Sequence, residues 1–200
     1  MALHIDPEIE EKYARFYDFA LRAVPPCESE TGETLVLEQL GDDALAAQVA
    51  AVAQPQQITC VMVRDCPQLV SLAALCALPN VEYVGVWRCK KLKELWNMSA
   101  QPRLAALVLV ECKALKTLAP LADAAPGLCH FFLQGRKWST PRLATLAPLP
   151  KLTHLVTCDL AVNKVSGGDV IYFEQQWPEL EALTITPNLA KYFKRVKESS

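Results

Sequence analysis

Apolar residues recur at a fixed spacing through the middle of the chain. Three cysteines, Cys66, Cys89 and Cys112, lie 23 residues apart, and each has apolar residues at the same six neighbouring positions. Around the first cysteine these positions hold Ile58, Val61, Val63, Leu69, Leu72 and Leu75. Self-similarity at a period of about 20 to 50 residues is typical of proteins built from stacked repeats. We therefore expect one structural unit that is repeated along the chain.

Each unit begins with a pattern that predicts a β-strand. The apolar residues five and three positions before the cysteine alternate with other residues, so their side chains share one face of an extended chain. The apolar positions after the cysteine close the other side of a core that only stacked repeats can bury. The pattern continues with steps of 24, 24 and 28 residues, to units that begin at Leu128, Leu152 and Leu180.

The segments VEYVGVWRCKKLKELW (residues 81–96) and LAALVLVECKALKTLAPL (residues 104–121) resemble leucine-rich repeats of pattern LxxLxLxxCxxLxxL. The resemblance covers residues 57–186 and implies an α/β fold, a right-handed leucine-rich repeat solenoid with a parallel β-sheet on its concave face. In this family the concave face usually binds another protein. The family often places asparagine where this chain has cysteine, which implies that Cys66, Cys89 and Cys112 are buried structural thiols with weak hydrogen bonds to loop backbone.

The ends of a solenoid expose apolar core, so we expect helical caps. Residues 1–56 predict an N-terminal helical cap and an irregular first repeat. Within them, Asp6 and Pro7 begin a helix that runs to about Val24, GETLVLEQL forms a strand, and a helix starts at Asp42 or Asp43. Residues 57–186 hold the repeats. Residues 187–200 predict a C-terminal capping helix, LAKYFKRVK, and a tail; the basic run in this helix is interpreted as a solvated face.

Composition and charge limit the classes of partner that we expect. The 20 basic and 22 acidic residues leave a net charge of −2, so no general field favours nucleic acid or an anionic membrane. The chain is 52% hydrophobic, but no uncharged apolar run of about 18 residues predicts a membrane span. The first residues lack the basic and apolar regions of a signal peptide, and the eight cysteines form no CxxC pair. We therefore expect a cytoplasmic protein with reduced thiols.

No catalytic motif, cofactor motif or metal motif is present, so we expect a protein that is not an enzyme and needs no cofactor. His130 and His154 both lie two residues after the leucine that opens their unit, which predicts neighbours about 5 Å apart on the concave face. A metal site would need a third ligand, and Cys158 should lie about 13 Å from His154 along the strand. We interpret both histidines as ordinary surface residues.

The predicted concave face is unusually apolar for a surface in contact with water. Large exposed apolar areas with aromatic anchors are typical of interfaces. We therefore predict a partner-binding patch, exposed in the isolated chain with Trp87 and Phe132 as anchors, that consists of Met62, Tyr83, Trp87, Val108, Val110, His130, Phe132 and Val156. Beside it, Asp65, Arg88 and Glu111 form a row of alternating charge across adjacent strands, which predicts cross-strand ion pairs.

Two functions and one structural explanation fit this patch. The first function is a non-enzymatic protein–protein interaction module, or scaffold, that binds a partner protein through the concave face. The alternative is an inhibitor or immunity-type regulator that neutralises a toxin or enzyme. The structural explanation is that a terminal segment, or a second copy of the chain, covers the apolar face. The identity of the partner and the oligomeric state stay open.

Overall fold

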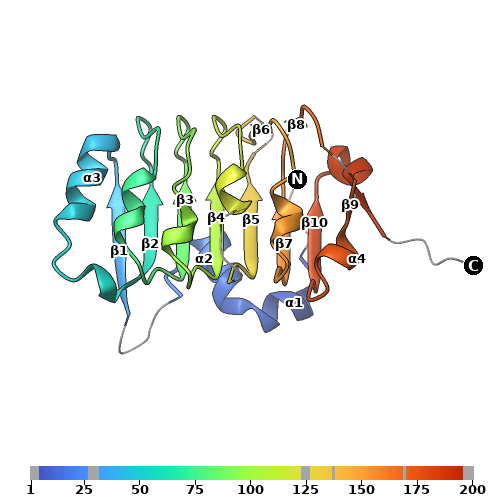
Figure 1. Ribbon diagram of the computed structural model, residues 1–200, viewed down its shortest axis with the longest axis horizontal. Helices are drawn as coiled ribbons and strands as arrows, with labels where there is room; N and C mark the ends of the chain where they lie inside the picture. Colours follow the sequence, from blue (N-terminus) through green and yellow to red (C-terminus); the bar gives the residue numbers. More distant parts are fainter. Residues whose placement is uncertain (1–4, 27–31, 123–126, 137, 169, 196–200) are drawn as a thin grey trace, which may run out of the picture.

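A seven-stranded parallel sheet forms the centre of the molecule. The computed structural model describes residues 5–26, 32–122, 127–136, 138–168 and 170–195. The strands lie side by side in their order along the chain (Figure 1). They are β1 (Glu33–Glu38), β2 (Ile58–Arg64), β3 (Tyr83–Trp87), β4 (Ala106–Val110), β5 (His130–Gln134), β7 (Thr157–Leu160) and β10 (Ala182–Ile185). The protein is therefore a mixed α/β fold, as the sequence predicted.

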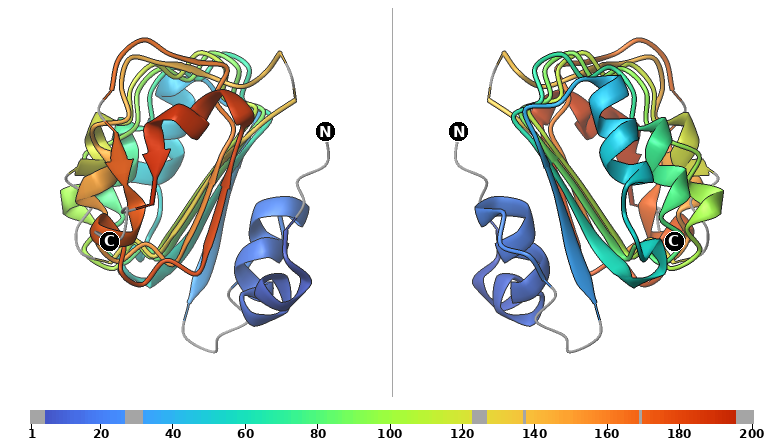
Figure 2. Two further views of the ribbon diagram at one scale, coloured as in Figure 1. Left: turned by 90° about the vertical axis from the view of Figure 1, so that its right-hand side faces the viewer. Right: turned by 90° about the vertical axis from the view of Figure 1, so that its left-hand side faces the viewer.

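Short helices and loops return the chain from the end of one strand to the start of the next. They lie on one face of the sheet (Figure 2) and comprise α3 (Asp42–Ala50), η1 (Pro55–Gln57), η2 (Ala73–Ala77), η3 (Met98–Ala100), η4 (Ala119–Ala122), η5 (Leu149–Lys151), α4 (Phe173–Gln176) and η6 (Pro187–Tyr192). Two small parallel pairs lie outside the main sheet: β6 (Arg142–Leu143) with β8 (Lys164–Val165), and β9 (Ile171–Tyr172) with β11 (Phe193–Lys194).

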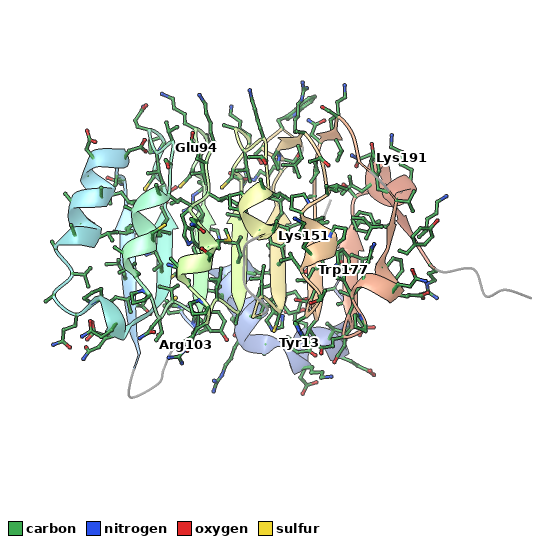
Figure 3. All side chains as sticks on the ribbon, viewed as in Figure 1. Tyr13, Glu94, Arg103, Lys151, Trp177 and Lys191 are labelled. Carbon is green, nitrogen blue, oxygen red and sulfur yellow. The ribbon has the colours of Figure 1, made fainter. Side chains whose placement is uncertain are left out.

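The main core fills the space between the sheet and these connections. The repeated apolar positions supply it, including Val61, Val84 and Leu107 from three successive strands, all fully buried. Trp177 lies inside the same layer near the last strands (Figure 3), where its indole N–H donates to the carbonyl of Leu149 at 3.2 Å. Because each unit contacts mainly its neighbours, one uniform period is enough to place these residues.

A tight turn ends each of the first four strands in the same way. Gln39, Asp65, Arg88 and Glu111 have left-handed backbone conformations, with φ between 52° and 58°. The N–H of each one donates to the carbonyl at the end of the next strand; for Asp65 and Trp87 the distance is 3.0 Å. Left-handed conformations are uncommon for residues other than glycine. Their recurrence at one position shows that the four units share a single turn geometry.

The predicted register is wrong in the fifth unit. His130 pairs with Thr157, 27 residues later, and not with His154. The segment LVTCDL therefore uses Leu155, Cys158 and Leu160 as its interior residues, all three fully buried. The sequence allowed both frames because leucines lie at 152 and 155, three residues apart. Pairing between β5 and β7 selects the later frame, which buries Cys158 in the core instead of placing it beside His154.

The C-terminal segment also differs from its prediction. The expected helix is a 3₁₀ helix, η6, that ends at Tyr192 and is followed by strand β11. Leu189 and Phe193 are buried, and the Phe193 ring lies 6.1 Å from that of Trp177. Pairing of β11 with β9 explains why the helix does not continue. The end of the predicted helix and the tail, residues 196–200, lie outside the described residues.

Candidate functional site

Two N-terminal helices cover the face of the sheet opposite the main core (Figure 2). They are α1 (Pro7–Lys12) and α2 (Ala14–Arg22), separated by a break at Tyr13. The predicted start is confirmed: the Asp6 side chain accepts a hydrogen bond from the Glu8 N–H at 2.9 Å, and Pro7 is the first helical residue. The predicted position is wrong, because the helices lie across the sheet and do not cap its end.

The residues beneath α2 form a second apolar cluster, separate from the main core. Its members on α2 are Phe16, Tyr17, Phe19 and Ala20, which helical spacing brings to one side. Its buried members on the sheet are Cys60, Met62, Trp87, Ala106, Val108 and Phe132. We call these sheet residues, together with the partly buried Tyr83 and Val110 and the polar His130 and Asp159, the α2 face.

The predicted exposure of this patch is wrong. Trp87 is 4% exposed and Phe132 is 2% exposed, because α2 covers them. Met62 and Val108 are also buried, and Tyr83, Val110 and His130 are half-buried. Val156 is not part of the α2 face, since it immediately precedes β7. In the structure, a terminal segment covers this face. This is the structural explanation that the sequence left open.

Gly85 provides space at the centre of the contact. The Phe19 ring meets the rings of Trp87 and Tyr83 edge-on, with centroids 5.2 Å and 5.9 Å apart. A Cβ atom on Gly85 would lie 2.8 Å from Cζ of Phe19 and 1.9 Å from the Trp87 ring. Such contacts are too short, so only glycine allows both rings to lie against the strand. The glycine thus forms the floor of the site that holds Phe19.

The Trp87 side chain also makes a polar contact with the helix. Its indole N–H donates to the carbonyl of Ala20 at 3.4 Å. Ala20 lies in the last turn of α2, where carbonyl groups have no hydrogen-bond partner within the helix. The α2 face therefore combines an apolar contact with a donor placed at a helix C-terminus.

His130 is held in its neutral form beneath the helix. The Phe16 ring stacks on the imidazole at 4.7 Å and 21°, and the Tyr13 ring lies 5.3 Å away. On the sheet, Nδ1 of His130 lies 2.9 Å from the Thr157 hydroxyl. Burial lowers the pKa of His130 to about 4. The expected pairing with His154 is wrong: His154 precedes β7, is exposed, and lies 3.4 Å from Glu179.

Asp159 is a candidate functional residue that the predicted frame missed. It lies in β7 beside Phe132, is fully buried, and accepts a hydrogen bond from the Tyr17 hydroxyl at 3.4 Å. Burial raises the pKa of Asp159 to about 6, while hydrogen bonds with Thr184 and Tyr17 oppose the rise. The signal was present in LVTCDL, because the later of its two possible frames turns Asp159 toward the α2 face.

Charged residues surround the site at its exposed edges. Lys12 of α1 pairs with Glu181 at 2.6 Å, which ties the helical pair to the chain just before β10. The predicted charge row is confirmed for Asp65 and Arg88, which pair at 2.5 Å, and Glu111 pairs with Arg136 at 3.3 Å. All of these pairs include exposed side chains, so each contributes little to stability.

Packing is looser between α1 and the last strand. A cavity of about 350 Å³ separates them, and its lining includes Ile5, Ile9, Glu181 and Thr184. No residue of α1 is buried, whereas α2 buries four residues against the sheet. The helical pair is thus anchored by α2 and less tightly held at α1.

The cysteine row lies in the main core, as predicted. Cys66, Cys89 and Cys112 are fully buried free thiols. Cys66 Sγ accepts from the Leu40 N–H at 3.3 Å, and Cys112 Sγ lies 3.8 Å from the carbonyl of Val86. Burial raises the pKa of Cys112 to about 12. These contacts are structural and do not reach the α2 face.

The described residues contain no group of three or more histidine, cysteine, aspartate or glutamate side chains placed to hold a metal ion. Across the same parts of the chain, no helix has the length and apolar character that crossing a membrane requires. Comparison of the sequence with models of known protein families gives no match, and comparison with curated proteins gives none either.

Proposed function

We propose that this chain is a leucine-rich repeat solenoid and a non-enzymatic interaction module, which binds a partner protein through the α2 face. In this proposal α1 and α2 occupy the site in the free protein, and the partner displaces them. The observation that carries the proposal is that a terminal segment covers an aromatic surface without contributing to the main core. Location in the cytoplasm is part of the same proposal.

The strand order supports a solenoid. Parallel strands follow one another in chain order, and β2, β3 and β4 pair with no shift in register. A doubly wound fold would reverse its strand order and place crossover helices on both faces of the sheet. Here the helices on the α2 face come from the N-terminus and not from connections between strands.

The helical pair can leave without breaking the sheet. Among the described residues, no backbone–backbone hydrogen bond joins α1 or α2 to a strand. The polar links are made by side chains and include Trp87 to the Ala20 carbonyl, Tyr17 to Asp159, and Lys12 to Glu181. Displacement therefore exposes the aromatic residues of the α2 face and leaves the ladder of strand hydrogen bonds intact.

An uncovered α2 face has the composition of a binding hot spot. Trp87 and Tyr83 are of the residue types that most often dominate binding energy, and Phe132 adds a large apolar surface. Such a surface is unfavourable in water, so it requires a cover in the free protein. A partner that supplies a better-fitting apolar surface would replace that cover.

The test compares two single substitutions in α2. Phe19→Ala removes a fully buried ring and should weaken the cover by roughly 3 kcal/mol. Leu21→Ala is the matched control, because Leu21 is 46% exposed in the same helix. Capture from extracts of the source cells should recover a protein at least about tenfold more efficiently with Phe19→Ala than with wild type or the control.

Footprinting on the purified complex should show α2 newly exposed to labelling, because the partner has displaced it, while the residues of β2–β5 on the α2 face stay protected. Equal capture by all three proteins would contradict displacement of the cover. Protection confined to another surface would contradict the α2 face as the binding site.

A further inference from the structure

We infer that the segment of the partner that binds the α2 face is an amphipathic helix, with aromatic residues spaced as in α2. The inference rests on the proposed function and names the kind of partner it requires. It follows from the hydrogen-bonding groups that the α2 face offers to an incoming chain, and from the contacts that α2 itself makes with that face.

The α2 face offers an incoming backbone almost nothing to bind. Strands β2, β3, β4 and β5 are interior strands, so their N–H and C=O groups are used within the sheet. An extended segment laid on this face would bury its own backbone groups against apolar side chains without partners, which is costly. A helix satisfies its backbone internally and can present an apolar side.

One donor on the face matches a helix end. The Trp87 indole N–H meets the Ala20 carbonyl, and the final carbonyls of a helix are the backbone acceptors that still need partners. A bound helix of the same polarity as α2 would bring its last turn to this donor. The contact therefore favours one direction of the helix across the sheet.

The side-chain positions also have helical spacing. Phe16 stacks on His130, Tyr17 reaches Asp159, Phe19 lies over Gly85, and Ala20 brings its carbonyl to Trp87. These positions are i, i+1, i+3 and i+4, which share one side of a helix but alternate between the two sides of a strand. The site thus selects two aromatic residues three apart and a hydroxyl-bearing aromatic residue between them.

The probe is a fluorescent peptide of residues 5–24, added to the 200-residue chain. It should bind the Phe19→Ala protein at least about tenfold more tightly than wild type, because the tethered segment of wild type competes for the same site. In the peptide, Phe19→Ala should weaken binding by at least about tenfold. Leu21→Ala in the peptide is the control and should leave binding unchanged.

A second peptide separates helical from extended recognition. Asp18→Pro keeps every aromatic side chain but removes helical structure, because proline is incompatible with a helix interior. It should lose measurable binding. Binding as tight as that of the unmodified peptide would overturn the helix inference, yet leave the α2 face as a protein-binding site.

The inference is also overturned if none of the peptides binds, provided that hydrogen exchange shows that α2 is detached from the sheet in the protein used. If Phe19→Ala does not fold, Tyr17→Phe serves instead, since it keeps the ring and removes only the hydroxyl contact with Asp159. Failure of the proposed function has a different signature: the natural partner would protect a surface other than the α2 face.

Discussion

Asp159 and His130 are ionisable side chains that α2 covers on the sheet, and replacing one or the other should change the pH dependence of folding in opposite directions. Around Asp159 lie Tyr17 of α2 and Thr184 of β10, and around His130 lie the ring of Phe16 and the hydroxyl of Thr157. Burial dominates both pKa shifts.

The Asp159 carboxyl favours the folded state at low pH. Raising its pKa from 3.8 to about 6 corresponds to about 3 kcal/mol of unfolding free energy. This contribution is complete below pH 3.8, where the carboxyl is protonated in both states, and it is lost as the pH rises through about 6. Asp159 alone therefore makes the protein less stable as the pH increases.

The His130 imidazole has the opposite effect. Lowering its pKa from 6.5 to about 4 also corresponds to about 3 kcal/mol. This contribution is present above pH 6.5 and is lost as the pH falls through about 4, because the unfolded chain then binds a proton that the folded chain excludes. The two effects oppose each other between about pH 4 and pH 6, so together they leave the wild-type stability nearly constant there.

Urea unfolding at a series of pH values, followed by far-UV circular dichroism, tests the argument. Relative to wild type, Asp159→Asn should gain stability as the pH rises from about 4 to 6, and His130→Gln should lose it. Exposed ion pairs contribute equally to all three proteins and cancel in the differences. A His130→Gln profile parallel to that of wild type would refute burial of neutral His130 beneath α2.

Three further substitutions, with Leu21→Asp as a control for the third, test the packing of the main core and the α2 face by urea unfolding. Cys89→Arg should lower the unfolding free energy by more than about 3 kcal/mol, because its charge would lie unpaired in the main core; a loss below about 1 kcal/mol would contradict that position. Gln101→Leu should cost about 2 kcal/mol, because Gln101 accepts from the Trp96 indole at 2.6 Å and donates to two buried carbonyls; unchanged stability would mean that water replaces these bonds. Phe132→Asp should cost at least about 3 kcal/mol, whereas Leu21→Asp should cost little, and equal effects would contradict the cover over the α2 face.

The sequence by itself determined the repeat and its interior positions. The fixed step between Cys66, Cys89 and Cys112 was enough to predict successive strands and the burial of the residues around each cysteine. This part was predictable because each unit packs mainly on its neighbours, so the same local pattern has the same environment in every unit. The resemblance to leucine-rich repeats implied the parallel sheet, and repetition of the cysteines together with the core leucines predicted that the cysteines are buried.

Where the period breaks, only the tertiary structure decided the register. Leu152 and Leu155 offered two frames that satisfy the same apolar pattern. A shift of three residues exchanges the two faces of a strand, and so it moved Cys158 into the core and Asp159 onto the α2 face. The pairing with β5 made this choice, which no local pattern within the unit expresses.

The sequence also did not determine where the N-terminal helices lie. Their apolar stripe predicts that α1 and α2 pack against an apolar surface, but the chain contains two such surfaces: the end of the repeat and the outward side of its strands. Phe19 fits the latter because Gly85 leaves space beside Trp87 on β3. The rest of the surface under α2 comes from β2, β4 and β5, so it exists only after these strands have assembled. Amphipathic periodicity determines that a helix must be buried on one side, while the shape of the assembled surface determines where.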